Sequence, residues 1–172
     1  MSALYTYSVP VFINGLTMLS TILKTAEEYA EEKKFSTSVL AESRLIADMK
    51  PLSYQVQRAS DTAKNTLVRV AGTEPVPMAD TETTFEELQE RIARTIEVLK
   101  SVDAAVFAGK EDKVIEMKLG PQQELTFKGE AYITTFALPN FFFHIQTAYA
   151  ILRKEGVPLG KANYLGPFMA SN

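Results

Sequence analysis

The sequence contains one histidine, His144, and places it in "FALPNFFFHIQTAYAIL" (residues 136–152), a run with no charged side chain. An imidazole has a reference pKa of about 6.5, so it can donate or accept a proton near neutral pH. General acid/base catalysis on a bound molecule is the chemistry that such a group suits best. The function of His144 therefore depends on the residues that surround it.

The residues spaced around His144 predict a pocket. On a helix that advances about 100° per residue, this histidine shares one side with Asn140 and Ala148. Both have short side chains that leave room beside the imidazole. Aromatic rings would flank this side, namely Phe136, Phe141 and Phe143. Two interpretations stay open: an acid/base or ligand-orienting imidazole in a cavity, or a neutral core histidine held by one or two hydrogen bonds.

Partners for His144 are expected on a helix that precedes it in the chain. Gln55 lies beside the apolar stripe of residues 45–70, and Asp61 lies further from that stripe. Either could orient the imidazole or the substrate, although Asp61 could also form a surface ion pair with Lys64. Tyrosine hydroxyls are alternative proton donors and ligand contacts, namely Tyr54, Tyr132 and Tyr149.

Metal and cofactor motifs are missing from the sequence. There is no cysteine, and a zinc site needs three or four converging ligands. Phe141 stands three residues before His144, so the Glu-x-x-His pair of di-iron bundles is absent. No glycine-rich phosphate loop is present. We therefore expect no metal and no cofactor, with a divalent ion on His144, Asp61 and other carboxylates as the alternative.

The amino-acid composition limits the classes of partner that we expect for this protein. The net charge of -3 argues against nucleic acid, which calls for a basic face. Residues 1–23 and 131–152 are uncharged and long enough to span a bilayer, but both contain several polar groups that are costly in hydrocarbon. The N-terminus lacks the basic and apolar regions of a secretory signal. We expect a soluble cytoplasmic protein without a membrane partner, and a homodimer is compatible with the sequence.

Apolar periodicity predicts helices at about 8–34, 43–71, 84–104 and 129–154. Pro51 falls inside the second, so we expect either a kink there or a helix that starts near Lys50. A capping box from Thr84 with Glu87, or Thr83 with Glu86, opens the third helix. Alternation over about 113–128, with a turn at Gly120-Pro121, predicts a β-hairpin. The expected fold is all-α: one domain (1–172) forming an antiparallel four-helix bundle with a hairpin before its last helix. In the tail (156–172), Tyr164, Leu165 and Phe168 should pack back on the body.

Two segments carry a resemblance to a known family: "RLIADMKPLSYQVQRASDTAK" (residues 44–64) and "ALPNFFFHIQTAYAILRKEGVPLGKANYLG" (residues 137–166). They resemble an uncharacterised branch of the DinB-like (YfiT-like) superfamily, a domain of unknown function found in bacteria and fungi. The resemblance extends over nearly the whole chain and implies a four-helix bundle with a central pocket.

The superfamily's metal site is matched only in part. Its metal-bearing members carry one histidine on the second helix and a His-x-x-x-His pair on the fourth. His144 matches the first member of that pair, Ala148 stands in the place of the second, and the second helix has no histidine. The resemblance therefore implies the position of the pocket. It does not carry over the thiol-dependent transferase and isomerase activities of the better-understood relatives.

These observations predict a metal-independent enzyme with His144 as general acid/base, acting on a small, largely apolar organic molecule. Isomerase, cyclase, dehydratase and lyase reactions fit, because each needs proton transfer and shape rather than a cofactor. Specialised metabolism is a plausible setting. A non-catalytic small-ligand-binding or stress-response protein is the first alternative, and a divalent-metal-dependent DinB-like transferase is the second.

Overall fold

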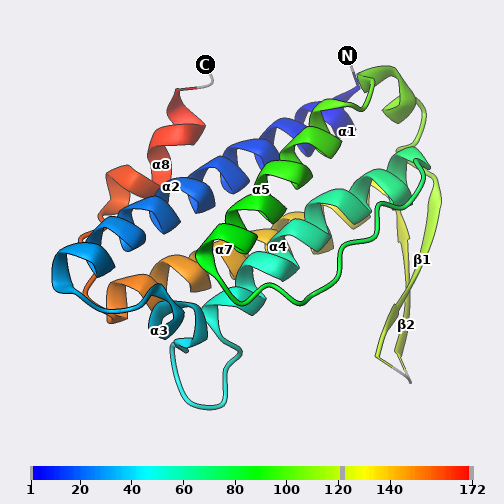
Figure 1. The fold of residues 1–172 in the computed structure, drawn as a ribbon. Coiled ribbons are helices and arrows are strands. Elements are labelled where there is room, and N and C mark those ends of the chain that lie inside the picture. Colours follow the sequence, from blue (N-terminus) through cyan, green and yellow to red (C-terminus); the bar gives the residue numbers. More distant parts are fainter. Residues whose placement is uncertain (1, 121–122, 171–172) are drawn as a thin grey trace.

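The computed structural model describes residues 2–120 and 123–170, which form a bundle of helices with one β-hairpin (Figure 1). The bundle consists of four long helices: α2 (Val9–Lys33), α4 (Leu52–Thr66), α5 (Phe85–Lys100) and α7 (Leu138–Lys154). Helices α5 and α7 each pack against α2 and α4. The predicted fold class, a helical bundle with a small hairpin before its last long helix, is confirmed.

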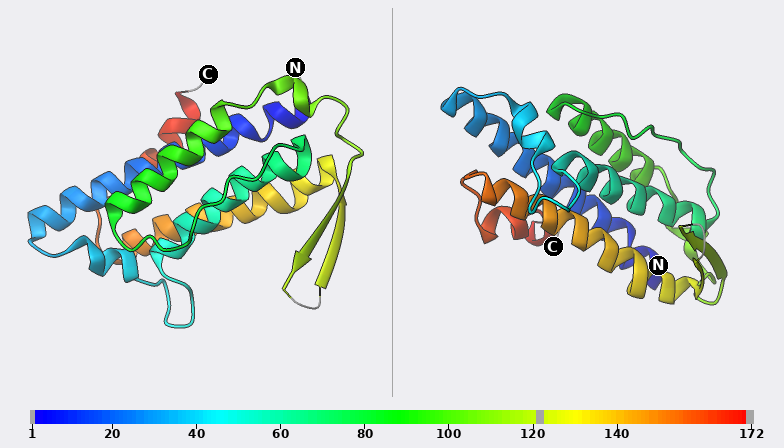
Figure 2. Two further views of the ribbon diagram at one scale, coloured as in Figure 1. Left: turned by 45° about the vertical axis from the view of Figure 1, so that its right-hand side comes forward. Right: turned by 90° about the horizontal axis from the view of Figure 1, so that it is seen from below.

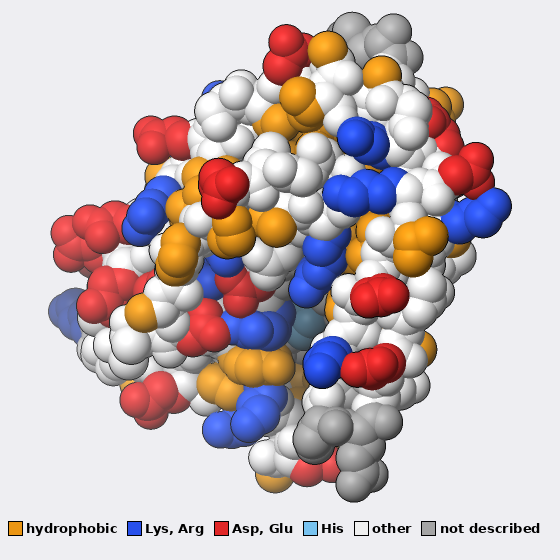
Figure 3. All heavy atoms as spheres, turned by 90° about the vertical axis from the view of Figure 1, so that its right-hand side faces the viewer, with side chains coloured by type: hydrophobic (Ala, Val, Ile, Leu, Met, Phe, Trp, Pro, Cys, Tyr) orange, Lys and Arg blue, Asp and Glu red, His pale blue; other side chains and the backbone are white. Residues whose placement is uncertain are grey.

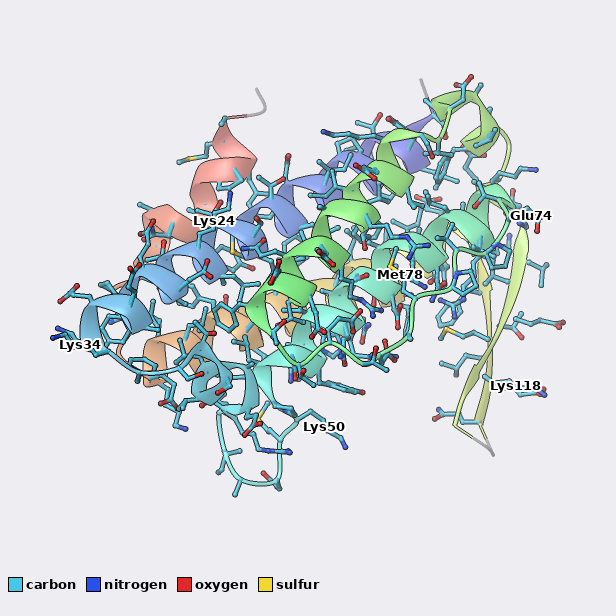
Figure 4. All side chains as sticks on the ribbon, viewed as in Figure 1. Lys24, Lys34, Lys50, Glu74, Met78 and Lys118 are labelled. Atoms are coloured by element: carbon cyan, nitrogen blue, oxygen red, sulfur yellow. The ribbon has the colours of Figure 1, made fainter. Side chains whose placement is uncertain are left out.

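The long helices do not simply alternate in direction. Helix α2 runs antiparallel to α5, and α4 runs antiparallel to α7, but α4 and α5 run the same way (Figures 1 and 2). Residues 72–84, which we call the crossover segment, contain neither helix nor strand and return along the bundle to the start of α5. The crossover segment lays Met78 over α4 (Figure 4), where its Sδ lies 3.9 Å from the Ser60 hydroxyl.

The helix expected at 43–71 has the late start that Pro51 allows. Its first residue is Leu52, directly after Pro51, because a proline is tolerated at a helix start but not in its interior. A short helix, α3 (Thr37–Glu42), and a loop precede it. At its other end, α4 continues into a π-helical turn, η1 (Leu67–Ala71), and stops at Gly72, whose φ of 79° favours glycine.

The start of α5 is the predicted capping box. The Thr84 hydroxyl accepts from the Glu87 amide at 3.2 Å, and the Glu87 carboxylate accepts from the Thr84 amide at 3.0 Å. These two reciprocal bonds satisfy amides that have no partner within the helix. The helix predicted to reach residue 104 ends at Lys100 and is followed by a short 3₁₀ helix, η2 (Ala104–Phe107).

The hairpin joins β1 (Val114–Leu119) to β2 (Gln123–Lys128), with Ile115 opposite Phe127 and Met117 opposite Leu125. Pro121 of the predicted turn lies outside the described residues. A helical stretch follows without a break: α6 (Gly129–Ala131), the π-helical η3 (Tyr132–Ala137) and α7. Gly129 is required at the junction, because a Cβ there would lie 2.1 Å from the Lys110 carbonyl oxygen.

The chain ends pack on the bundle as helices. Helix α1 (Ala3–Thr6) precedes α2, and α8 (Lys161–Met169) lies within the predicted tail, whose residues 171–172 are outside the described part. Tyr164 packs on Tyr149, with ring centroids 5.8 Å apart, and Phe168 packs on Phe142 at 6.0 Å. The prediction that Tyr164 and Phe168 pack against the body of the protein is confirmed.

One described stretch, Ala3–Lys33, is long and apolar enough to cross a membrane by length and composition. Apolar residues of this stretch lie on the side of α2 that faces the other helices, where Phe12, Leu16, Leu19 and Leu23 are fully buried. A core helix of a bundle has the same composition as a membrane span. The packing therefore accounts for the apolar character of this segment.

Candidate functional site

A groove of about 290 Å³ lies between α4, α7 and β1. This volume is at the lower end of the roughly 300–1,000 Å³ usual for small-molecule pockets. We call it the His144 groove, and its lining consists of Tyr54, Arg58, Asp61, Thr62, Asn65, Arg69, Met117, Lys118, Phe136, Asn140 and His144. In Figure 3 the pale blue of the histidine is visible at the bottom of a hollow among lysine and arginine side chains.

Helical spacing aligns the walls of the groove. On α4 and η1, Tyr54, Arg58 and Arg69 follow one another at steps of four and eleven residues, which keeps them on one face. Phe136 and His144 are eight residues apart on the facing wall, with Asn140 between them. The groove is therefore elongated along the two helices, with His144 at one end and Arg69 at the other.

His144 is held from inside the bundle by Gln55. The Gln55 amide nitrogen donates to the Lys50 carbonyl at 3.0 Å, which turns the amide oxygen toward His144 Nδ1 at 2.8 Å. An amide oxygen can only accept, so Nδ1 carries the hydrogen of the neutral ring. Nε2 then keeps its lone pair, and it is accessible from the groove without a hydrogen-bond partner among the described residues.

Burial keeps this imidazole neutral. His144 is 8% exposed, and loss of hydration lowers its pKa from 6.5 to about 4, with a smaller contribution from the positive charge of Arg58. Asp61 also lines the groove, but its carboxylate is already neutralised by nearby cations. At pH 7 the ring is therefore a hydrogen-bond acceptor or a base at Nε2, and it has no proton there to donate.

Asp61 does not orient His144. Its carboxylate accepts from Arg91 at 2.8 Å, from Lys64 at 3.0 Å and from Arg58 at 2.8 Å. The contact with Arg91 joins α4 to α5. The structure thus brings Gln55 to the imidazole and places Asp61 in an ion-pair network beside the groove.

Arg58 is the cation next to the imidazole. Its guanidinium contacts Asp61 and Asp80 and lies 5.3 Å from the centroid of the Tyr54 ring. Its Nε is buried and has no hydrogen-bond partner among the described residues. A buried donor without an acceptor costs roughly 1–3 kcal/mol.

Three further predicted residues lie in or behind the groove. The Tyr54 ring packs edge-on against the His144 ring, with centroids 6.1 Å apart. Asn140 lines the groove and donates to the Thr62 hydroxyl at 2.8 Å. Tyr132 is fully buried behind the wall, where its hydroxyl accepts from Arg69 at 2.9 Å.

The remaining predicted contacts lie elsewhere. Phe141 and Ala148 are fully buried in the core and do not line the groove. Phe143 is 56% exposed, with its ring 5.3 Å from that of His144, and Tyr149 packs under α8. In place of the expected apolar pocket, the structure has a groove that combines polar and charged side chains with the apolar surface of Met117 and Phe136. The apolar side of α7 packs against α2 instead.

Sequence reasoning misses most of the charged lining. It gives no role to Arg58, Arg69 or Lys118. Because Tyr54, Arg58 and Arg69 share one helical face, their spacing is a usable signal. Nothing in the sequence indicates that the hairpin adds Lys118 and Met117 to the same groove.

The groove does not fit the three-histidine metal site of metal-bearing DinB-like proteins. Over residues 2–120 and 123–170, no three His, Cys, Asp or Glu side chains come together as potential ligands. Buried Ala148 follows His144 by one turn, and Gln55 occupies Nδ1. The neighbouring Arg58 charge also opposes a cation. These residues therefore do not reproduce that site.

The state of His144 can be measured directly, because a chain with one histidine gives one set of imidazole NMR signals. At pH 7 the nitrogen shifts should show a protonated Nδ1 and an unprotonated Nε2, and titration should give a pKa well below 6.5. In Gln55→Leu the tautomers should mix, because the acceptor that selects Nδ1–H is gone. A wild-type ring protonated at Nε2 would contradict this geometry.

The same pKa shift has a signed effect on stability. The folded pKa is about 4 and the unfolded value is near 6.5, so the unfolded chain binds more protons between these pH values. His144 should therefore lower the unfolding free energy as the pH falls from 6.5 to 4. The difference between wild type and His144→Gln in urea unfolding should follow that window, and a difference that is independent of pH would contradict it.

Comparisons with known proteins agree with this architecture. A family model described as Domain of unknown function (DUF1993) matches residues 4–165. The crystal structure of a DinB family member protein from Shewanella denitrificans is 41% identical, covers 95% of this chain and 92% of that chain, and superposes with a TM-score of 0.86. No curated protein matches the chain. The chain therefore belongs to the DUF1993 family of domains of unknown function and has the fold of a DinB family member.

Proposed function

We propose that this protein is a cofactor-independent enzyme that moves a proton on a small organic molecule in the His144 groove. The observation that carries the proposal is the chain from the Lys50 carbonyl through the Gln55 amide to His144, which leaves an unprotonated Nε2 facing the groove. Such a fixed tautomer is what a general base requires. A cytoplasmic location without a membrane or nucleic-acid partner fits this activity.

The chemistry starts with proton abstraction next to a carbonyl group. Nε2 takes a proton from a substrate C–H bond, and the bonding electron pair moves into an enolate. The positive charge of Arg58 lies close enough to lower the His144 pKa, so it also favours negative charge that develops there. In a β,γ-unsaturated carbonyl compound the negative charge extends to the γ-carbon, and returning the proton there completes an isomerisation. Where the substrate carries a β-leaving group, its departure with the bonding electron pair completes an elimination. Both outcomes balance without a redox partner.

The low pKa of free His144 agrees with this role once a substrate is bound. Above about pH 4 the ring is unprotonated and available as a base. As negative charge develops on the substrate beside it, the imidazolium form is favoured and its pKa rises. A base positioned in this way contributes roughly 10²–10⁴-fold to the rate.

A non-catalytic ligand-binding protein, including one with a stress-response role, is the second candidate. The observation that favours it is the same low pKa, because an imidazole that resists protonation suits a permanent hydrogen-bond acceptor. The two candidates differ in whether a proton leaves the ligand.

Deuterium exchange separates the two candidates even while the natural substrate and product are unidentified. Small ketones, aldehydes and keto acids are incubated with the protein in heavy water, and loss of the C–H signal next to the carbonyl is followed by proton NMR. Wild type should catalyse exchange in at least one class. His144→Gln should lose roughly 10²–10⁴-fold of that rate and keep binding, because the amide can still accept a hydrogen bond.

Two results would overturn the enzyme proposal. Binding that shifts the His144 signals without any exchange would support the ligand-binding protein instead. Exchange that is unchanged in His144→Gln would remove His144 as the base. Arg94→Gln, an exposed substitution on α5 outside the groove lining, is the control for both measurements.

A further inference from the structure

The His144 groove has an excess of positive charge in a chain whose net charge is negative. Its lining contains Arg58, Arg69 and Lys118 but only one carboxylate, that of Asp61. That carboxylate is engaged by Arg91 and Lys64 from outside the groove as well as by Arg58. Little of its charge is left to balance the other two cations.

Arg69 is the cation that is best prepared for a ligand. One terminal nitrogen donates to the Tyr132 hydroxyl at 2.9 Å, and the guanidinium lies 5.7 Å from the centroid of the same ring. Within the described part of the chain, no carboxylate comes within ion-pair distance of it. A guanidinium oriented by a neutral phenol keeps most of its N–H donors free, in the fork geometry that matches a carboxylate.

The hairpin adds a second cation to the groove. Lys118 lies on β1 and lines the same groove. Its side chain points away from the bundle (Figure 4), is 79% exposed and lies 3.3 Å from Glu124. Such an exposed pair is weak, so the ammonium can reorient toward a ligand at little cost. Arg69 is thus the cation that is fixed in place, and Lys118 is a second, exposed cation on the hairpin side of the groove. We call the Arg69 end of the groove the anion end.

The distance between the anion end and His144 sets the shape of the ligand. Phe136, which packs against the Tyr132 ring at a centroid distance of 5.7 Å, stands eight residues before His144. Eight helical residues correspond to roughly 12 Å along the axis. Phe136 and Met117 provide apolar surface in the lining between the two ends.

We propose that the ligand of this groove is an elongated organic acid, whose carboxylate binds Arg69 and whose chain runs toward His144, with Lys118 adding positive charge on the hairpin side of the groove. The proposal rests on the proposed function only for what happens at the His144 end. It names the substrate class: a linear monocarboxylate with an apolar chain, bound by charge at one end and by the imidazole at the other.

Matched acids and amides test the charge requirement. Butanoate, hexanoate and octanoate are titrated against their amides by calorimetry, with amide and imidazole NMR shifts as the structural readout. Acids should bind more tightly than amides, and octanoate should be the shortest of the three to shift the His144 signals. Arg69→Gln should weaken acid binding roughly 10- to 100-fold, as expected for the loss of a charge-assisted bond, and leave amide binding unchanged.

Two further variants keep the result interpretable. Lys118→Gln, on the exposed hairpin, leaves the bundle intact and should weaken acid binding by a smaller factor. Arg94→Gln removes the same charge from an exposed site outside the groove lining and should have no effect. If Arg69→Gln lowers the melting temperature, Lys118→Gln alone carries the comparison.

The possible failures differ from those of the proposed function. Equal binding of acids and amides, or acid binding that is unchanged in both Arg69→Gln and Lys118→Gln, would overturn the anion end and leave the base at His144 untouched. Acid binding that depends on Arg69, without deuterium exchange on any carbonyl compound, would support the anion end and reject the enzyme.

Discussion

Replacing Arg91 with methionine should lower the free energy of unfolding by about 3–5 kcal/mol, the usual cost of removing one partner from a buried ion pair. Arg91 lies on α5 and is only 3% exposed. Its side chain donates to the Ser60 hydroxyl, the Ala79 carbonyl, and the carboxylates of Glu82 and Asp61, at 2.7–3.1 Å. Methionine fills a similar length but donates to none of these acceptors.

The loss has a second consequence beside the groove. Arg91 attaches the crossover segment to α4 and α5, through Ala79 and Glu82 on one side and Asp61 on the other. Without it, the Asp61 carboxylate is less fully neutralised. Negative charge near an imidazole favours the protonated ring, so the pKa of His144 should rise above its wild-type value.

Urea unfolding measures the stability change, and NMR titration of the single histidine measures the pKa. Arg94→Met, on the same helix but exposed, is the matched control and should change stability by less than about 0.5 kcal/mol. A loss below about 1 kcal/mol for Arg91→Met would show that the buried network contributes little. An unchanged His144 pKa would show that the network and the imidazole are not coupled.

Replacing Phe141 with alanine should also cost about 3–5 kcal/mol, because a large fully buried ring leaves a cavity when it is removed. The ring packs edge-on against Phe12, with centroids 4.9 Å apart. A Cβ at Gly15 would lie 2.4 Å from it, so α2 and α7 approach closely only because residue 15 has no side chain. Phe141 belongs to this contact and not to the groove.

Phe143→Ala provides the matched comparison, since it removes the same ring from an exposed position two residues away. It should cost less than about 1 kcal/mol. Thermal and urea unfolding of the two variants give the contrast. In folded Phe141→Ala, acid binding in the groove should persist. Loss of binding without loss of stability would mean that Phe141 lines the ligand site, as its place in the sequence suggests.

Several elements were readable from local signals. The apolar stripe of α2, the capping box at Thr84 and Glu87, and the alternation in 113–128 each depend on residues a few positions apart. Local spacing determines which face of an element is buried. It also led to His144, since one imidazole in an uncharged run is conspicuous. The late start at Leu52 was within reach as well, because Pro51 excludes a helix interior.

Local spacing does not show which buried helix face packs against which other helix. Helical projection placed His144, Phe141 and Ala148 on or beside one face of the helix. In the structure α2 packs against this face and Phe141 and Ala148 are fully buried, whereas His144 lies at the edge of the face and lines the groove. In the sequence Asp61 resembled a surface residue, but the packing of α5 against α4 places Arg91 within ion-pair distance of it.

By itself, then, the sequence determined a helical bundle with an inserted hairpin and a single imidazole on an inward helix, because periodicity and residue type are properties of the chain. Tertiary structure decided that Gln55 selects the tautomer of that imidazole and that Arg69 and Lys118 line the same groove. Hydrogen bonds and charges act over a few ångströms, and contacts such as Gln55 with His144, 89 positions apart, exist only once the helices have packed.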